Sequence, residues 1–179
     1  MLTVTDSVLL VVDVQEKLFR VMYQKEQLAD NLQRLIKGIQ VLEVPVLVTE
    51  QYPRGLGPTI PEISKLLPDS RPMAKVSFSC CGDEAFLQAF KQLRRKQVLI
   101  AGIESHVCVY QTAADLLAAG YEVYVVNDAI SSRTEQNKDT GIKMMIQLGA
   151  KLTSTEASLF ELLKVAKGDK FKAISQIVR

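Results

Sequence analysis

Strand-like and helix-like segments alternate along the whole sequence, and this alternation limits the possible folds more than any other feature. Each strand candidate is a short run of apolar, mostly β-branched residues, which is typical of strands covered on both faces. Amphipathic helix patterns fill the intervals between these runs. The predicted strands are residues 8–13, 44–49, 73–78, 98–101, 121–126 and 150–153, and the predicted helices are residues 28–42, 63–67, 83–93, 107–119, 134–148, 155–163 and 171–178.

Strands that alternate with helices form a mainly parallel sheet with helices on both faces, because right-handed crossovers return each strand to the same direction. We therefore expect an α/β fold of the Rossmann-like kind with a six-stranded, mainly parallel sheet. No linker, internal repeat or low-complexity segment interrupts the pattern, so residues 1–179 are predicted to form a single domain. In such sheets, ligands bind beyond the carboxyl ends of the strands.

The composition argues against several classes of protein. Apolar residues make up 47% and charged residues 23% of the 179 residues, which is ordinary for a globular protein with a sizeable core. The net charge of +2 does not indicate a nucleic-acid partner. No apolar run approaches the ~20 residues that a membrane span needs. Three cysteines without paired spacing, together with the absence of a signal-peptide pattern, predict free thiols and a cytoplasmic location.

Three reactive side chains fall near the ends of predicted strands, at the expected ligand-binding edge. Asp13 ends the first strand, Lys75 lies in the third, and Cys108 follows a turn after the fourth, at the start of a helical pattern. Unpaired N–H groups and the positive end of the helix dipole favour a thiolate at Cys108, which is the reactive form of cysteine. An acid, an amine and a thiol at one edge would form a nucleophilic site.

Each of these residues also has a purely structural interpretation. Cys108 by itself could be a small buried core residue, and Asp13 could cap the following helix. Lys75 is harder to explain in this way, because a lysine is rarely buried without a partner. Cys80 and Cys81 are adjacent in a predicted loop, and we interpret them as structural or as incidental oxidation sites.

Other chemistries find little support in the sequence. The turn after the first strand has no glycine, and residues 55–57 (Gly-Leu-Gly) lack the third glycine and the helix of a dinucleotide-binding motif. No histidine or cysteine pair has metal-ligand spacing, so we expect no metal and no cofactor. The only histidine, His106, lies two residues before Cys108, and side chains at that spacing do not face each other on a helix. We therefore expect His106 to be a turn or interface residue and any catalytic base to be a carboxylate.

Three short motifs occur in a fixed order along the chain. The first strand ends in Asp13-Val14-Gln15, a D-x-Q pattern, and Lys75 precedes Val-Ser-Phe-Ser. Residues 102–109 read Gly-Ile-Glu-Ser-His-Val-Cys-Val. Together these motifs resemble those of the isochorismatase-like cysteine hydrolases over nearly the whole chain, the last one being similar to that family's G-[IV]-x-[TS]-x-x-C-V. The resemblance implies a three-layer α/β/α sandwich.

The resemblance also implies a set of site residues. The family's Asp–Lys–Cys triad corresponds to Asp13, Lys75 and Cys108, and its cis peptide bond before the nucleophile turn corresponds to Ile103–Glu104. The nicotinamidase branch carries an Asp/His metal site after the second strand, but residues 49–57 of this chain contain no histidine. The chain is therefore similar to a small single-domain subgroup without that metal site.

These observations lead us to expect a cysteine hydrolase. Cys108 would attack the carbonyl carbon of a small amide or related carbonyl compound, and a thioester would form. Asp13 would accept the thiol proton, and the Lys75 ammonium would stabilise the thiolate. Backbone N–H groups near Val107 and Cys108 would bind the oxyanion.

The remaining expectations concern the pocket, the partners and the alternatives. Positions just after strand ends predict a substrate pocket that includes Phe19, Glu50, Tyr52 and Glu104. The expected partner is a small-molecule substrate. The apolar tail (residues 171–178) indicates a homo-oligomer, and the resemblance implies the same because members of that family are commonly oligomeric. One alternative is hydrolysis of an isochorismate-type vinyl ether. Another is a non-enzymatic scaffold or redox-sensitive binding protein that retains the fold, with Cys108 as an oxidisable thiol.

Overall fold

A computed structural model describes all 179 residues and contains one six-stranded sheet. The strands lie in the order β3-β2-β1-β4-β5-β6, and every neighbouring pair is parallel. The strand order reverses between β1 and β4, which is the position where such sheets bind ligands. The predicted α/β fold is thus confirmed. The strands are β1 (Ser7–Val12), β2 (Val46–Gln51), β3 (Met73–Lys75), β4 (Gln97–Ile103), β5 (Glu122–Ser131) and β6 (Lys151–Thr153).

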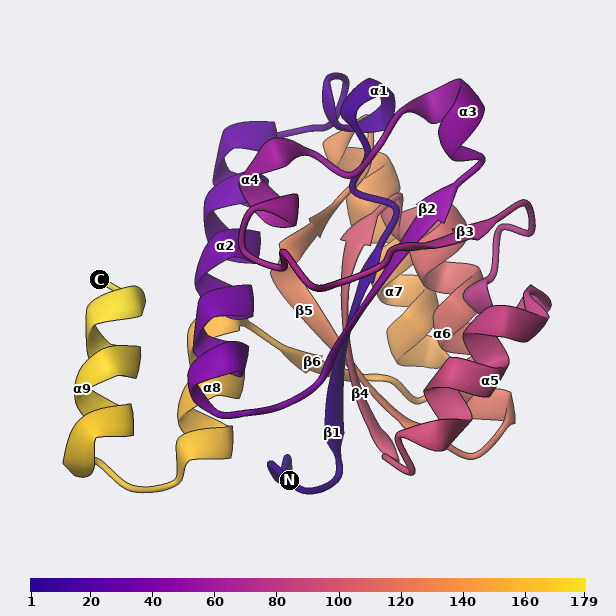
Figure 1. Cartoon of the computed structure of the whole chain (residues 1–179). Helices are drawn as coiled ribbons and strands as arrows, with labels where there is room; N and C mark the ends of the chain where they lie inside the picture. Colours follow the sequence, from indigo (N-terminus) through magenta and orange to yellow (C-terminus); the bar gives the residue numbers. More distant parts are fainter.

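Helices cover both faces of the sheet and complete three layers (Figure 1). One face carries α2 (Lys25–Val41), α8 (Thr155–Leu163) and α9 (Gly168–Ile177), and the other carries α5 (Glu84–Gln92), α6 (Tyr110–Ala118) and α7 (Glu135–Gln147). All six residues of β1 are buried, and they alternate between two core clusters of 24 and 17 residues. Leu9 and Val11 join the first cluster, whereas Val8 and Leu10 join the second. This division explains why the strand is apolar at every position from Val8 to Val12.

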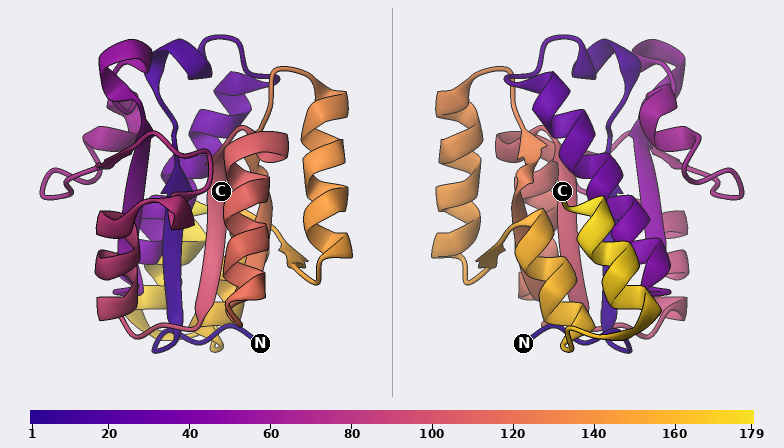
Figure 2. Two further views of the ribbon diagram at one scale, coloured as in Figure 1. Left: turned by 90° about the vertical axis from the view of Figure 1, so that its right-hand side faces the viewer. Right: turned by 90° about the vertical axis from the view of Figure 1, so that its left-hand side faces the viewer.

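The C-terminal helix α9 packs on the body of the same chain. Ile174 is fully buried in the cluster beneath α2, and Figure 2 shows α9 lying beside α2. The apolar tail, which the sequence analysis took as an indication of a homo-oligomer, therefore packs within its own chain. None of the helices combines the length and the apolar character that crossing a bilayer requires.

Short helices at the carboxyl edge of the sheet depart from the predicted loops. The sequence predicts no helix at α1 (Glu16–Phe19) or α3 (Pro53–Leu56), and α4 (Pro61–Ser64) begins two residues before the predicted residue 63. A helix of four residues is too short to show a periodic apolar pattern in the sequence. Tertiary contacts stabilise such short helices. One such contact is the buried Gln15, whose amide donates to the Gln51 and Gly57 carbonyls at 2.9 and 2.7 Å.

Several predicted boundaries are wrong in detail. The strand predicted at residues 73–78 ends at Lys75. The helix predicted from residue 107 begins as a π-helical turn (Ser105–Val109), against which α7 packs, and continues as α6. β5 continues past residues 127–128 to Ser131, where it still pairs with β4. Ser154 rather than Thr155 caps α8, since its side chain accepts from the Ala157 N–H.

Candidate active site

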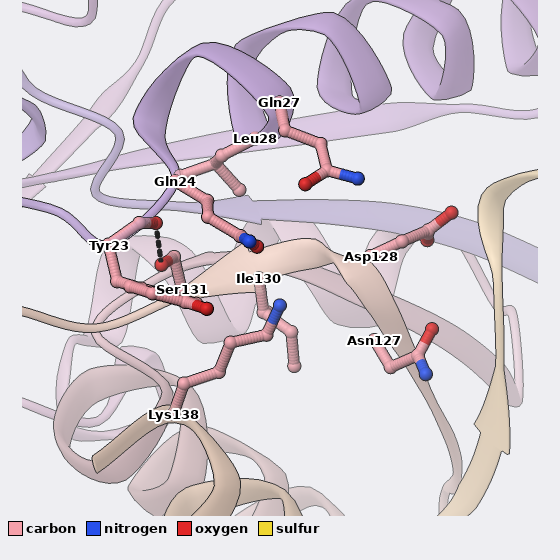
Figure 3. Close-up of a pocket in the computed structure, with 9 residues that line it drawn as sticks. All are labelled: Tyr23, Gln24, Gln27, Leu28, Asn127, Asp128, Ile130, Ser131 and Lys138. Atoms are coloured by element: carbon pink, nitrogen blue, oxygen red, sulfur yellow. Dashed lines mark hydrogen bonds between the residues drawn. The ribbon is translucent and has the colours of Figure 1, made fainter. Parts of the chain in front are cut away.

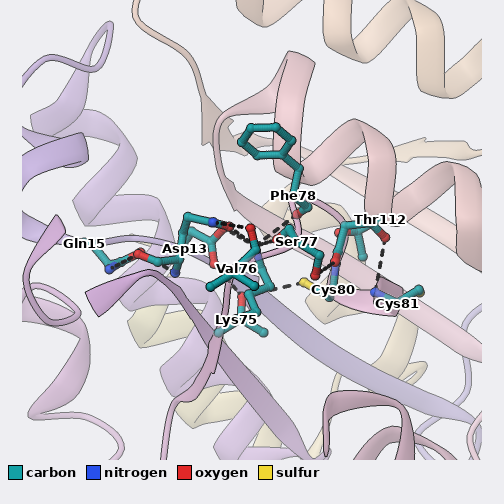
Figure 4. Close-up of polar contacts among 12 residues, drawn as sticks. Asp13, Gln15, Lys75, Val76, Ser77, Phe78, Cys80, Cys81 and Thr112 are labelled. Atoms are coloured by element: carbon teal, nitrogen blue, oxygen red, sulfur yellow. Dashed lines mark hydrogen bonds and ion pairs between the residues drawn. The ribbon is translucent and has the colours of Figure 1, made fainter. Parts of the chain in front are cut away.

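The carboxyl ends of β1 and β3 bring Asp13 and Lys75 together in the protein interior (Figure 4). Lys75 Nζ lies 2.7 Å from Asp13 Oδ2, and the exposed fractions of the two side chains are 1% and 0%. Removing two charges from water is costly, and their mutual attraction offsets this cost only when the remaining lone pairs and protons are satisfied. A fully buried ion pair at the ligand-binding edge is therefore a functional-site candidate.

Lys75 is held by more acceptors than its own ion pair. Its ammonium donates to Gln51 Oε1 at 2.8 Å, to the Phe78 carbonyl at 3.0 Å and to the Ser77 carbonyl at 3.1 Å. Figure 4 shows these contacts converging on the ammonium. Because four acceptors surround three N–H donors, the charged end of Lys75 is held in one place.

Asp13 is fixed through both of its oxygens. Thr49 Oγ1 donates to Asp13 Oδ1 at 2.8 Å, while Oδ2 faces Lys75. The Thr49 hydroxyl also lies 3.6 Å from Cys80 Sγ. Because the single hydroxyl hydrogen goes to the carboxylate, the Cys80 thiol is the donor in that contact. The helix after Asp13 has Gln15 at its N-cap without any side-chain cap, so the capping interpretation of Asp13 is wrong.

Cys108 lies in the turn after β4 and is only 6% exposed. Burial, followed by the negative charge of Asp13, raises the pKa of its thiol to about 12, although the positive charge of Lys75 lowers it. Desolvation and the nearby carboxylate thus outweigh the lysine and the helix start, which the sequence predicted to favour a thiolate. The structure instead places a protonated thiol beside a carboxylate that can accept its proton.

The other two cysteines are also protonated. Burial raises the pKa of Cys80 to about 11, and the same Asp13 and Lys75 charges act on it in opposite directions. Burial also raises the pKa of Cys81 to about 11, with the Asp115 carboxylate adding to the effect. All three thiols are free. Cys80 thus belongs to the surroundings of the Asp13–Lys75 pair, whereas Cys81 does not.

The turn that carries Cys108 is tied to the segment after β5. The peptide bond Ile103–Glu104 is cis, at the position that the resemblance implies. The buried Glu104 carboxylate binds the Arg133 guanidinium at 3.1 Å and accepts from the Arg133 N–H at 3.2 Å. His106 Nδ1 lies 3.0 Å from Ser132 Oγ. The Val107 N–H donates to the Glu104 carbonyl at 3.0 Å, so the amide of Cys108 is the better candidate for binding an oxyanion.

The predicted pocket residues have different surroundings. Glu50 Oε1 accepts from both the N–H and the hydroxyl of Thr59, each at 2.7 Å, so this carboxylate braces a loop. Tyr52 is 55% exposed, and Phe19 is half-buried against the core. No group of three or more His, Cys, Asp and Glu side chains is arranged to hold a metal ion.

The sequence interpretation missed several polar residues around the ion pair. They are Gln15, Thr49, Gln51 and Cys80. A signal for them exists, since polar residues directly at the end of an apolar strand, as in residues 49–51, point to the same edge as Asp13.

The fold and the site together define a three-layer α/β/α protein with a polar site at the carboxyl edge of a parallel sheet. Residues 7–157 match the model of the Isochorismatase domain. The Secreted isochorismatase effector Isc1 of Phytophthora sojae is 40% identical over 97% of this chain and 84% of its own length. The chain therefore belongs to the isochorismatase family, which includes hydrolases such as nicotinamidase.

Solved structures agree with this assignment. The MAR1 Ribonuclease of Caenorhabditis elegans superposes with a TM-score of 0.93 at 36% identity, covering 99% of this chain and 91% of that one. YcaC of Pseudomonas aeruginosa, solved with hexane-2,5-diol and covalent acrylamide, gives 0.93 at 25% identity, covering 99% and 89%. The Escherichia coli YcaC product, an octameric hydrolase of unknown specificity, gives 0.93 at 26% identity, covering 98% and 88%.

Proposed function

We propose that this protein is a cysteine hydrolase that cleaves a small amide or a related carbonyl compound, with Asp13, Lys75 and Cys108 as its catalytic residues. The observation that carries the proposal is the buried Asp13–Lys75 ion pair, whose two charges act on the Cys108 thiol. A carboxylate that is fixed on both oxygens beside a protonated thiol is suited to general-base catalysis.

The proposed reaction runs in two halves. Cys108 Sγ attacks the carbonyl carbon while its proton passes to Asp13, and the Lys75 ammonium balances the charge that develops. The Cys108 amide donates to the oxyanion, a contact whose loss typically costs ~10²–10³ in rate. Asp13 returns the proton to the leaving nitrogen, the C–N bond breaks and a thioester remains. Asp13 then takes a proton from water while the water oxygen attacks the thioester carbonyl carbon. The C–S bond breaks, a carboxylic acid leaves and Asp13 returns the proton to Cys108 Sγ.

One similarity supports a nucleophilic site, and a second supports a homo-oligomer. The P. aeruginosa YcaC structure holds covalent acrylamide, which is an electrophilic amide, and that protein superposes on 99% of this chain. The E. coli YcaC product is an octamer, which supports the prediction of a homo-oligomer here. A cytoplasmic location stays a prediction, and the relative Isc1 is described as secreted. Residues 1–179 are proposed to form one domain.

The test is a release assay with matched cysteine variants. Wild type, Cys108→Ala and Cys81→Ala would be incubated with a panel of small primary amides, and ammonia would be measured. Cys81 is the control because it lies outside the Asp13–Lys75 surroundings. We expect turnover in wild type and Cys81→Ala only, with an acyl adduct on Cys108 in intact-mass spectra. Full turnover by Cys108→Ala would refute the mechanism.

Further substrate classes separate the alternatives. A vinyl ether that turns over where amides do not would favour isochorismate-type hydrolysis. RNA is included because the C. elegans relative is described as a ribonuclease. Reversible thiol capping of Cys108 without turnover of any class would favour the redox-sensitive binding protein.

A further inference from the structure

A second polar pocket opens near the carboxyl edge of the sheet, between the start of α2, the end of β5 and α7 (Figure 3). Its empty space, including the part open to solvent, is about 420 Å³, and none of the three triad residues lines it. Leu28 and Ile130 supply a buried apolar floor. Ser131 Oγ donates to the Tyr23 carbonyl at 2.6 Å and so joins two of its walls. The pocket is therefore separate from the proposed reaction centre.

Two opposite charges line this pocket without pairing with each other. Lys138 takes part in none of the ion pairs of the molecule. Asp128 uses only Oδ1, which accepts from the Thr155 N–H at 2.8 Å and from its hydroxyl at 3.1 Å. A lysine and a carboxylate oxygen in one pocket are thus left with free hydrogen-bonding capacity.

The surroundings of Lys138 argue against a simple anion site. Burial lowers the pKa of Lys138 by removing water from its ammonium, while the carboxylates of Asp139, Asp128 and Glu135 raise it. An anion alone would gain from the lysine but would meet these acids. A molecule that carries both charges can place each one against its complement.

Three amide side chains complete the lining. Gln24, Gln27 and Asn127 each offer both donors and acceptors, and Figure 3 shows them around the same space as Lys138 and Asp128. Such side chains suit the polar atoms of a compact ligand, and the apolar floor suits its methylene or methyl groups.

We propose that this pocket binds a small zwitterion of amino-acid size, with its carboxylate on Lys138 and its ammonium on Asp128. The inference is independent of the proposed hydrolase function. The chain continues from the end of β5 to Arg133, which binds Glu104 at the start of the turn that carries Cys108.

The test is direct binding to the full chain. The common L-α-amino acids would be titrated singly by calorimetry and by NMR of the Leu28 and Ile130 methyl groups. Propionate and ethylamine would serve as analogues of L-alanine with one charge each. We expect saturable binding of at least one amino acid, with the single-charge analogues about tenfold weaker or more. Absence of binding by every amino acid, or equal binding by propionate and L-alanine, would overturn the proposal.

Variants locate the bound molecule. Lys138→Met keeps most of the aliphatic stem, and Asp128→Asn keeps the Oδ1 acceptor for Thr155, so both are expected to fold. Each should weaken binding by about tenfold or more, since a charge-assisted contact is lost. Lys143→Met, on the exposed face of α7, is the control and should bind as wild type does. Unchanged affinity in Lys138→Met would place the ligand elsewhere and refute the assignment.

Discussion

The reactivity of Cys108 depends on two opposite charges beside it. Asp13 favours the thiol and Lys75 favours the thiolate, and the carboxylate has the larger effect. The residue is therefore protonated at rest, and the same carboxylate that holds the proton on sulfur is placed to receive it during attack. As the proposed nucleophile, Cys108 would lose its proton only during attack on the substrate and would not rest as a thiolate.

The first prediction concerns alkylation of Cys108. Lys75→Met should raise its pKa and slow labelling by iodoacetamide at a fixed pH, whereas Asp13→Asn should lower the pKa and speed labelling. Each pKa unit changes the thiolate fraction by about tenfold. Mass spectrometry of labelling rates against pH gives the result, with circular dichroism to verify folding. Cys81, whose pKa responds to Asp115, is the internal control. Shifts of both variants in the same direction would contradict this assignment of charges.

The second prediction concerns Thr49, the partner of Asp13 Oδ1. Thr49→Val removes a buried donor to a carboxylate and should lower the free energy of unfolding by about 1–3 kcal/mol. It should also slow the proposed amide turnover, because the carboxylate loses its fixed position as general base. Thr49→Ser keeps the hydroxyl and should restore the turnover. A Thr49→Val variant that reacts like wild type would show that the hydroxyl only contributes to stability.

Close packing between elements holds the π-helical turn (Ser105–Val109) that carries Cys108. A Cβ at Gly141 of α7 would lie 2.5 Å from the Ser105 carbonyl carbon and oxygen, which belong to the π-helical turn. Ser105 Oγ also donates to the Lys138 carbonyl at 2.9 Å. The backbones of α7 and of the turn are therefore in direct contact at Gly141, where only glycine fits because it has no Cβ.

The third prediction uses two helical glycines. Gly141→Ala should lower the free energy of unfolding by about 1–3 kcal/mol, because backbone cannot move aside. It should also change the rate of Cys108 alkylation. In Gly38→Ala the new Cβ would meet the side chain of Leu159 at 2.5 Å, and a side chain can rotate. That control should lose less stability and keep the wild-type rate. Urea unfolding measures the stability and labelling kinetics measure the alkylation rate. Equal losses of stability in the two variants would contradict the close contact between Gly141 and the Ser105 backbone.

For the molecule as a whole, the buried thiols link folding to pH. The folded chain keeps protons on Cys80 and Cys108 up to pH values near 11 and 12, whereas an ordinary thiol releases its proton near 9. Above that value the unfolded chain binds fewer protons than the folded chain. The free energy of unfolding therefore falls as the pH rises through this interval.

The fourth prediction is the slope of this loss. Above its pKa in the unfolded chain, each such thiol lowers the free energy of unfolding by about 1.4 kcal/mol per pH unit. Urea unfolding between neutral pH and about pH 10 should therefore show a smaller loss in Cys80→Ala than in wild type, although the variant starts from lower stability. Parallel curves for the two proteins would show that Cys80 is not protonated as described.

Periodicity along the chain was enough to predict the architecture. The continuous apolar run at residues 8–12 indicates a strand buried on both faces, and the apolar stripe of α2 indicates a helix buried on one face. Both patterns can be recognised in the local sequence. Because parallel strands end at a common edge, their order along the chain also predicted that Asp13 and Lys75 would meet.

The protonation and the partners of the site depended on tertiary structure. The pKa of Cys108 follows from how deeply the turn is buried and how near Asp13 lies, and neither is encoded in neighbouring residues. Thr49 and Gln51 of β2 contact Asp13 and Lys75 at the ends of the two neighbouring strands, and Gln15 secures a loop more than thirty residues away along the chain. Desolvation and long-range hydrogen bonding act through space, so only the folded arrangement decides them.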